Sequence, residues 1–232
     1  MYKENKKMPE EKFRDFLKEV KPIRFKEPLA ETLGAFKEED TVVEYTFIDV
    51  IKMAGHACPT VASAYICCQN ALERLYPNDV PVRGNISITI YGEPDEGVYG
   101  VISQVFSFLT GAAPITGFHG LGYKFKRKDL IKFNPEKMDA EAMQFEFKRL
   151  DNNKAVLASL YTQNIPFPED KSRRLGELME RVIWEAAKAK EAEEFQELWM
   201  KKVENIVLMK KEIDKWLKLE VSKKWKRLML KD

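Results

Sequence analysis

The fold is decided by residues 45–75, which read YTFIDVIKMAGHACPTVASAYICCQNALERL. Residues 45–54 have a helical pattern, and Gly55 stands where a helix is expected to end. Pro59 suits the first turn of a second helix, because the N–H that proline lacks is not needed there. From residue 61 to residue 75, apolar side chains recur every three or four positions. The stretch therefore predicts two helices joined by a short turn.

Strands are predicted further along the chain, where polar and apolar residues alternate. Residues 85–91 show the clearest alternation, and residues 143–147 alternate again. Residues 98–109 favour a helix, because their apolar side chains share one face. Residues 123–133 indicate a basic strand or hairpin arm, and residues 154–160 a strand or a short helix. The mixture predicts an α+β fold.

The composition divides the chain into three parts. Residues 1–40 are rich in charge and predict a peripheral N-terminal segment with short helices near residues 8–20 and 29–36. We expect the core domain over residues 41–168. Residues 169–232 contain no proline and hold all four tryptophans, which predicts a helical C-terminal extension. Such long helices would fold back as a hairpin or pack against a second chain.

The charge balance excludes some classes of partner. Lys and Arg number 39 against 37 Asp and Glu, whereas a nucleic-acid binder needs a segregated basic face. No run approaches the roughly 18 apolar residues of a membrane span, so no transmembrane segment is expected. The three cysteines are too few for a disulfide framework, and the N-terminus is polar. These features predict a cytoplasmic protein.

The chemistry is expected at residues 54–60, AGHACPT, which hold one of two histidines and one of three cysteines. Cys58 would lie near a helix N-terminus, whose partial positive charge favours a thiolate, so we regard it as the candidate catalytic residue. His56 could pair with that thiolate or share a metal ion with it. The other histidine, His119, lies in a glycine-rich loop. Together His56, Cys58 and His119 would make a three-ligand site with an open position.

The alternative interpretation of this motif has equal weight: a hydrogen-bonded core histidine beside a small apolar cysteine. Cys67 and Cys68 are better explained by core packing, because neighbouring helical positions point about 100° apart and cannot jointly clamp one ion. The loop over residues 117–122 lacks the glycine spacing of a dinucleotide site. The tryptophans after residue 169 favour dimerisation or internal packing over a basic membrane-surface helix.

At Gly55-His56-Ala57-Cys58-Pro59 the chain resembles the FmdE-like protein family, whose namesake is a component of formylmethanofuran dehydrogenase and which carries a His-Gly-His-x-Cys-Pro-Gly signature. The resemblance covers roughly residues 41–160. It implies a mixed sheet flanked by helices, a somewhat thioredoxin-like core, a tendency to dimerise, and zinc binding in some members. Three residues depart from the family pattern and remove companion ligands or the signature glycine: Ala54, Thr60 and Ala112.

Three hypotheses follow. The first is an FmdE-like metal-binding protein that uses His56 and Cys58, with zinc as the first candidate and iron or haem iron as alternatives. Its role would be redox, carrier or accessory subunit, and whether it is an enzyme stays open. The second is a thiol-redox or sulfur-handling protein that acts through Cys58. The third is a non-enzymatic subunit whose helical tail binds a partner, a second copy of the chain first.

Overall fold

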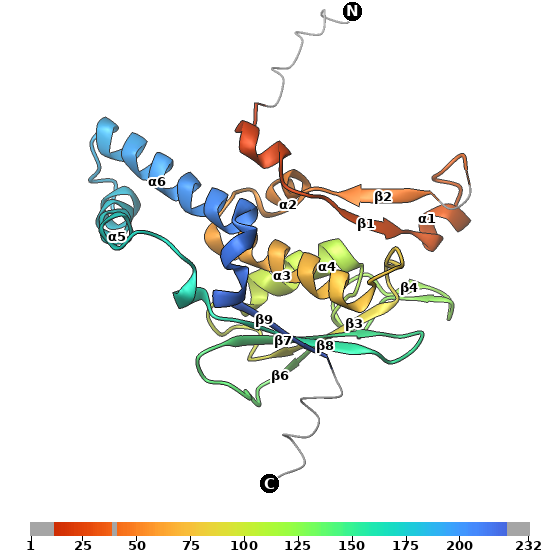
Figure 1. Cartoon of the computed structure of the whole chain (residues 1–232). Helices are drawn as coiled ribbons and strands as arrows, with labels where there is room; N and C mark the ends of the chain where they lie inside the picture. The colour runs from red at the N-terminus through yellow and green to blue at the C-terminus, as the bar shows by residue number, and fades with distance from the viewer. Residues whose placement is uncertain (1–11, 39–40, 222–232) are drawn as a thin grey trace, which may run out of the picture.

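The computed structural model describes residues 12–38 and 41–221 (Figure 1). Its centre is a five-stranded sheet in the order β6-β3-β7-β8-β9, with β3 parallel to β6 and the other neighbours antiparallel. The strands are β6 (Ile131–Asn134), β3 (Ile86–Tyr91), β7 (Met143–Arg149), β8 (Ala155–Leu160) and β9 (Leu217–Val221). The sheet is thus mixed, and the expected α+β fold is confirmed.

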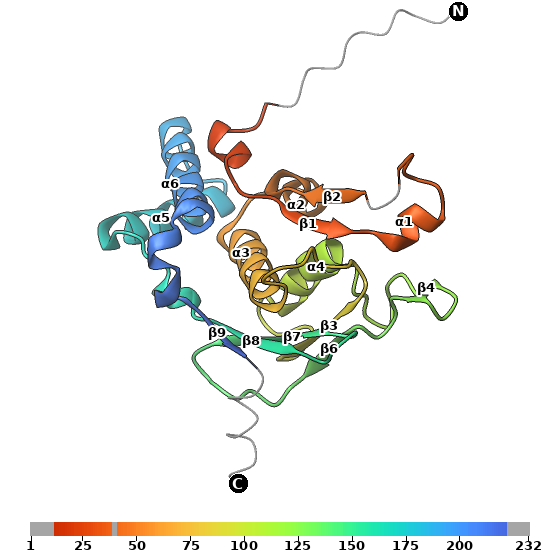
Figure 2. The same ribbon diagram turned by 45° about the vertical axis from the view of Figure 1, so that its right-hand side comes forward.

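Helices α3 (Pro59–Leu75) and α4 (Tyr99–Thr110) cover one face of this sheet in both views (Figures 1 and 2). The side chains of Ile86, Ile88 and Ile90 alternate along β3 and are buried, as the alternation predicts. Phe106 of α4 meets the rings of Phe145 and Phe147 edge to face, with centroids 5.1 and 5.0 Å apart. The predictions of strands near residues 85–91 and 143–147 and of a helix near 98–109 are confirmed.

Helix α3 is the most deeply buried helix among the described residues. Its predicted apolar face is buried throughout, at Val61, Tyr65, Cys68, Leu72 and Leu75. The opposite side is covered too, because α3 also packs against α2 (Phe47–Ala54) and α6 (Ala189–Leu208). Residues 61–69 are buried on every side of the helix, which requires mostly apolar or small residues around the circumference, and the alanines and cysteines of α3 supply them.

The N-terminal segment differs from the expected peripheral helical segment. After a short 3₁₀ turn, η1 (Asp15–Lys18), comes strand β1 (Ile23–Lys26), which pairs antiparallel with β2 (Val42–Tyr45). A short helix, α1 (Pro28–Thr32), lies between them. Phe25 is fully buried in the common core, because the β1–β2 ribbon lies over α3 and α4 on the side away from the sheet (Figure 2). Residues 8–11 of the helix expected near 8–20 lie outside the described residues.

The C-terminal part folds back as a helical hairpin, as one alternative predicted. After the 3₁₀ turn η2 (Thr162–Asn164), helices α5 (Glu169–Ile183) and α6 pack against each other, and η3 (Lys210–Lys215) follows. The expectation of an all-helical extension is wrong for its last described part, because β9 pairs with β8 in the central sheet. Trp216 and Leu217 are buried in the same core as α3. Trp225 lies outside the described residues.

A two-stranded ribbon, β4 (Gly120–Leu121) and β5 (Phe125–Lys126), projects from the main body (Figures 1 and 2). It occupies part of the region in which a basic hairpin arm was expected. Within the described ranges, no helix is both long and apolar enough to cross a lipid bilayer.

Candidate metal half-site at the start of helix α3

Both ends of α2 are fixed by local hydrogen bonds, and this places the motif residues that follow it. Thr46 and Asp49 form a capping box at the start of α2, which fixes where this helix begins. At the other end, Gly55 has a φ of 75° and its N–H donates to the Ile51 carbonyl at 2.8 Å. A side chain at this φ would be strained, so glycine allows the tight reversal between α2 and α3.

His56 lies exposed in this turn, and one hydrogen bond orients its ring. Its Nδ1 atom lies 3.0 Å from the Ala54 carbonyl oxygen. A carbonyl oxygen only accepts, so Nδ1 is the donor, and in the neutral form of the ring this leaves the lone pair on Nε2. Metal-binding histidines commonly donate their second ring N–H to a backbone carbonyl in this way. The imidazole is therefore prepared to ligate through Nε2.

Cys58 is the N-cap residue of α3. Its Sγ atom accepts a hydrogen bond from the Val61 N–H at 3.4 Å, and its carbonyl accepts the first helical bond, from Ala62 at 2.9 Å. Pro59 follows as the first helical residue, and the first turn carries no acidic side chain. The side chain is partly exposed. A sulfur that accepts an N–H at the start of a 17-residue helix sits where negative charge is stabilised.

Helix α6 holds the turn between these two residues. The indole Nε1–H of Trp199 donates to the Ala57 carbonyl at 2.8 Å, across 142 residues of sequence. The Trp199 ring also packs against Phe195, with centroids 5.4 Å apart. No sequence signal distinguished Trp199 beforehand, since its place in an apolar stripe resembles ordinary packing.

The other two cysteines have no access to this site. Cys67 and Cys68 are fully buried, and burial raises the pKa of both thiols. Their expected role in core packing is confirmed. The alternative interpretation of the motif expected a buried histidine, but His56 is exposed.

His119 lies in an exposed loop just before β4. Its carbonyl accepts N–H bonds from Arg127 at 2.9 Å and Lys128 at 3.3 Å, so its backbone closes the β4–β5 ribbon. Among residues 12–38 and 41–221, no three His, Cys, Asp or Glu side chains gather closely enough to hold a metal ion. The three-ligand set of His56, Cys58 and His119 therefore does not assemble within one chain, and metal binding by His56 and Cys58 stays a prediction.

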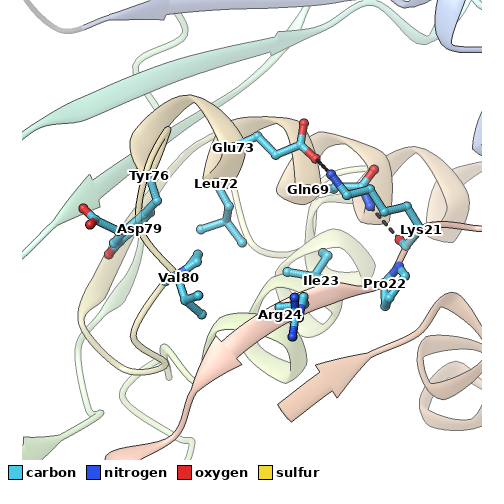
Figure 3. Close-up of a pocket in the computed structure, with 11 residues that line it drawn as sticks. Lys21, Pro22, Ile23, Arg24, Gln69, Leu72, Glu73, Tyr76, Asp79 and Val80 are labelled. Atoms are coloured by element: carbon cyan, nitrogen blue, oxygen red, sulfur yellow. Dashed lines mark hydrogen bonds and ion pairs between the residues drawn. The ribbon is translucent and has the colours of Figure 1, made fainter. Parts of the chain in front are cut away.

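A groove of about 590 Å³ opens beside the start of α3. Pro59, Thr60 and Ser63 line it from α3, and Lys202 lines it from α6. Neither His56 nor Cys58 lines this groove. A second hollow, of about 180 Å³, lies between β1 and the far half of α3, where Gln69 donates to the Lys21 carbonyl (Figure 3). Its lining holds neither histidine nor cysteine.

A buried charged cluster stands apart from both hollows. Glu27 accepts from Arg83 at 2.7 Å and from Arg127 at 2.6 Å. Arg83 also donates to the carbonyls of Phe108 and Leu109, which are left open at the end of α4. Burial lowers the pKa of Arg127, and Glu27 opposes this effect. The cluster joins the N-terminal segment to α4, and no sequence spacing announces it because its members come from three distant segments.

Comparison with known proteins adds no family. A scan against protein-family models found no match to the chain, and a search of curated proteins found none either.

Proposed function

We propose that this protein binds a metal ion through His56 Nε2 and Cys58 Sγ, with zinc as the first candidate and iron or haem iron as alternatives. The observation that carries the proposal is the pair of supporting bonds. The Ala54 carbonyl leaves Nε2 of His56 free, and the Val61 N–H donates to Sγ of Cys58. Imidazole and thiolate together suit zinc and iron. The likeness of Gly55-His56-Ala57-Cys58-Pro59 to the FmdE-like signature supports the same assignment.

Two side chains make half of a tetrahedral site. A second copy of the chain would supply another histidine and another cysteine, and so complete a Cys₂His₂ set across a two-fold axis. Both side chains are at least partly exposed, which such sharing requires. A homodimer with the metal at its interface therefore explains why no three-ligand group gathers within the described part of one chain. The free thiols fit a reducing, cytoplasmic setting.

Within this proposal each residue has one task. Gly55 makes the turn, His56 and Cys58 hold the ion, and Trp199 fixes the backbone between them. A bound zinc ion supplies Lewis-acid chemistry where a ligand position stays open. A site filled by four protein ligands instead stabilises an assembly. The exposed half-site supports the role in assembly, which would make the protein a carrier or an accessory subunit.

The test is elemental analysis of tag-free protein, with matched histidine variants. We expect one metal ion per two chains in the unaltered protein, and loss of the metal in Cys58→Ser and in His56→Gln. His119→Gln is the control, because it removes the other histidine and should leave the metal content unchanged. Metal-free protein that still takes up no zinc after dialysis would sink the proposal. Loss of metal in His119→Gln would instead mean that His119 of a second copy is one of the ligands.

Oligomeric state gives an independent measurement. Light scattering after gel filtration should show a dimer with zinc and a monomer after chelation. Cys58→Ser should behave as a monomer under both conditions. A dimer that persists after chelation and in Cys58→Ser would exclude the shared metal site and would mean that another interface holds the two chains together.

A second candidate function is thiol redox or sulfur chemistry by Cys58 alone. It is favoured by the place of Cys58, a partly exposed residue, at the N-terminus of α3. It predicts a metal-free protein in which one thiol reacts rapidly with hydrogen peroxide and is restored by dithiothreitol. Stoichiometric metal, or a thiol inert to peroxide, would contradict it.

The third function, partner binding through the helical tail, is favoured by Ile183 and Trp184, which are 65% and 80% exposed at the end of α5. Deleting everything after residue 170 would remove β9 from the central sheet, so point variants are the better test. Under this function Ile183→Ser with Trp184→Ser should weaken self-association or partner binding. Unchanged light scattering at all protein concentrations would remove the second copy as the partner.

A further inference from the structure

One surface is not used by the proposed metal site: the β4–β5 ribbon together with the loop before it. We call residues 115–128 the basic apolar hairpin. Four of its apolar side chains are exposed, far more than such residues usually are: Ile115 65%, Phe118 58%, Leu121 48% and Tyr123 98%. Both views show the ribbon projecting at the edge of the molecule, on the side opposite α5 (Figures 1 and 2). A cluster of this kind marks an interaction site.

The charge of the hairpin has one sign. No Asp or Glu occurs from Gly97 to Lys128, and Lys124, Lys126 and Lys128 follow each other at alternate positions. None of these three lysines forms an ion pair with another residue that the structure describes. The Lys124 ammonium lies over the Phe125 ring, 5.1 Å from its centroid. These basic and apolar groups together suit an anionic partner that also accepts apolar side chains.

The pairing of the ribbon arranges these groups. Leu121 lies opposite Phe125, and Gly120 lies opposite Lys126. Opposed residues share one face of a two-stranded ribbon, so one face is apolar while the other carries a lysine. Tyr123 occupies the turn at the tip. The ribbon thus carries apolar side chains on one face and at its tip, and basic side chains beside them.

We propose that the basic apolar hairpin binds the surface of an anionic lipid bilayer, with Tyr123, Leu121 and Phe118 entering the headgroup region. Aromatic side chains favour this region, and lysines beside it attract anionic headgroups. A nucleic acid would gain little from the aliphatic side chains of Ile115 and Leu121, which have no ring face on which bases stack. A protein partner usually covers about 20–30 residues a side, more than this narrow hairpin offers.

The experiment is co-sedimentation of the full chain with lipid vesicles. We expect binding to phosphatidylcholine vesicles that contain phosphatidylserine, weaker binding at high salt, and little binding to pure phosphatidylcholine. Changing Lys124, Lys126 and Lys128 to Gln should weaken binding about a hundredfold, or about fivefold for each lysine. Leu121→Ser with Tyr123→Ser should weaken it by at least about tenfold.

Matched controls separate the hairpin from the rest of the chain. Ile183→Ser with Trp184→Ser removes an equally exposed apolar pair from the opposite side and should leave binding unchanged. Lys223→Gln with Lys224→Gln tests the basic C-terminal residues, which lie outside the described part of the chain. Unaltered protein that stays in the supernatant with anionic vesicles overturns the proposal. Full binding by hairpin variants that melt like the unaltered protein overturns it too, as does tighter binding to a single-stranded oligonucleotide than to vesicles.

Discussion

At the scale of single residues, Cys58 at the start of α3 has an access to solvent that Cys67 and Cys68 within the helix lack. Cys58 caps α3 and is partly exposed, whereas Cys67 and Cys68 are fully buried in the middle of the same helix. Burial in an apolar environment disfavours the charged form of a thiol and excludes reagents. The sequence pattern already favoured core packing for Cys67 and Cys68, and in the packed structure Cys58 is the one of the three that has access to solvent.

Alkylation tests this difference. Iodoacetamide at mildly alkaline pH should modify one cysteine of the folded, metal-free protein and all three in denaturant, as read by mass spectrometry. Cys58→Ser should show no modification when folded. Labelling of Cys67 or Cys68 under conditions in which the protein stays folded would mean that α3 opens more readily than its burial implies.

The Glu27 carboxylate is the second residue whose role depends on its surroundings. It is the acidic partner of two buried or partly buried guanidinium groups. Removing its charge leaves those groups without compensation, which typically costs about 3–5 kcal/mol for a buried pair. Glu27→Gln should therefore lower the free energy of unfolding by a few kcal/mol in urea titrations. Glu19→Gln, at an exposed site, should change it by less than about 0.5 kcal/mol. Equal effects of the two changes would show that the cluster is not stabilised by charge.

At the scale of elements, α6 positions the turn that carries the motif. The bond from the Trp199 indole to the Ala57 carbonyl links α6 to the segment between α2 and α3. The α5–α6 hairpin is therefore part of the candidate site as well as an addition to the core. A long-range contact also holds the end of α4, because the Arg83 side chain donates hydrogen bonds to the carbonyls of Phe108 and Leu109.

Trp199→Phe isolates that bond, because it keeps an aromatic ring and removes the donor. We expect the free energy of unfolding to fall by about 1 kcal/mol, the usual net value of one hydrogen bond. We also expect weaker zinc binding in competition with a chelating dye, because the turn between the two ligands loses its anchor. Trp184→Phe, on the exposed end of α5, is the control and should alter neither quantity. Unchanged zinc affinity in Trp199→Phe would make the contact purely structural.

At the scale of the whole molecule, the two ends of the described chain both enter the core. Strand β1 joins a ribbon over α3 and α4, and β9 forms the edge of the central sheet beside β8. Trp216, which is 2% exposed, anchors the start of β9 in the cluster that includes α3. The core is therefore built from contacts between segments that lie far apart in the sequence.

Trp216→Ala measures the contribution of the C-terminal strand. Replacing a buried tryptophan by alanine costs about 3–5 kcal/mol, so the variant should unfold at clearly lower urea concentration or fail to fold. Glu220→Gln, an exposed change on the same strand, should behave like the unaltered protein. A mild effect at Trp216, of about 1 kcal/mol or less, would mean that β9 docks on an already complete sheet.

Much of the local structure could be predicted from residue patterns. The helical spacing in α3, the glycine that ends α2 and the alternation along β3 are local signals, and each element lies where its signal places it. The error at β9 has a physical reason. Its five residues, LKLEV, alternate as a strand does, but they follow two long helices rich in Lys, Glu and Leu. Whether such a stretch becomes helix or strand depends on the free edge of β8, which lies about 60 residues earlier in the chain.

The sequence by itself determined the two helices that meet at Gly55, the α+β class, and the position of His56 and Cys58 together at a helix start. These follow from backbone preferences and from side-chain periodicity, which act over a few residues. Only the tertiary structure decided that His119 lies apart from the motif, that Trp199 holds the turn, and that β9 pairs with β8. Burial and long-range hydrogen bonds depend on which segments meet, and that choice is made by packing of the whole chain.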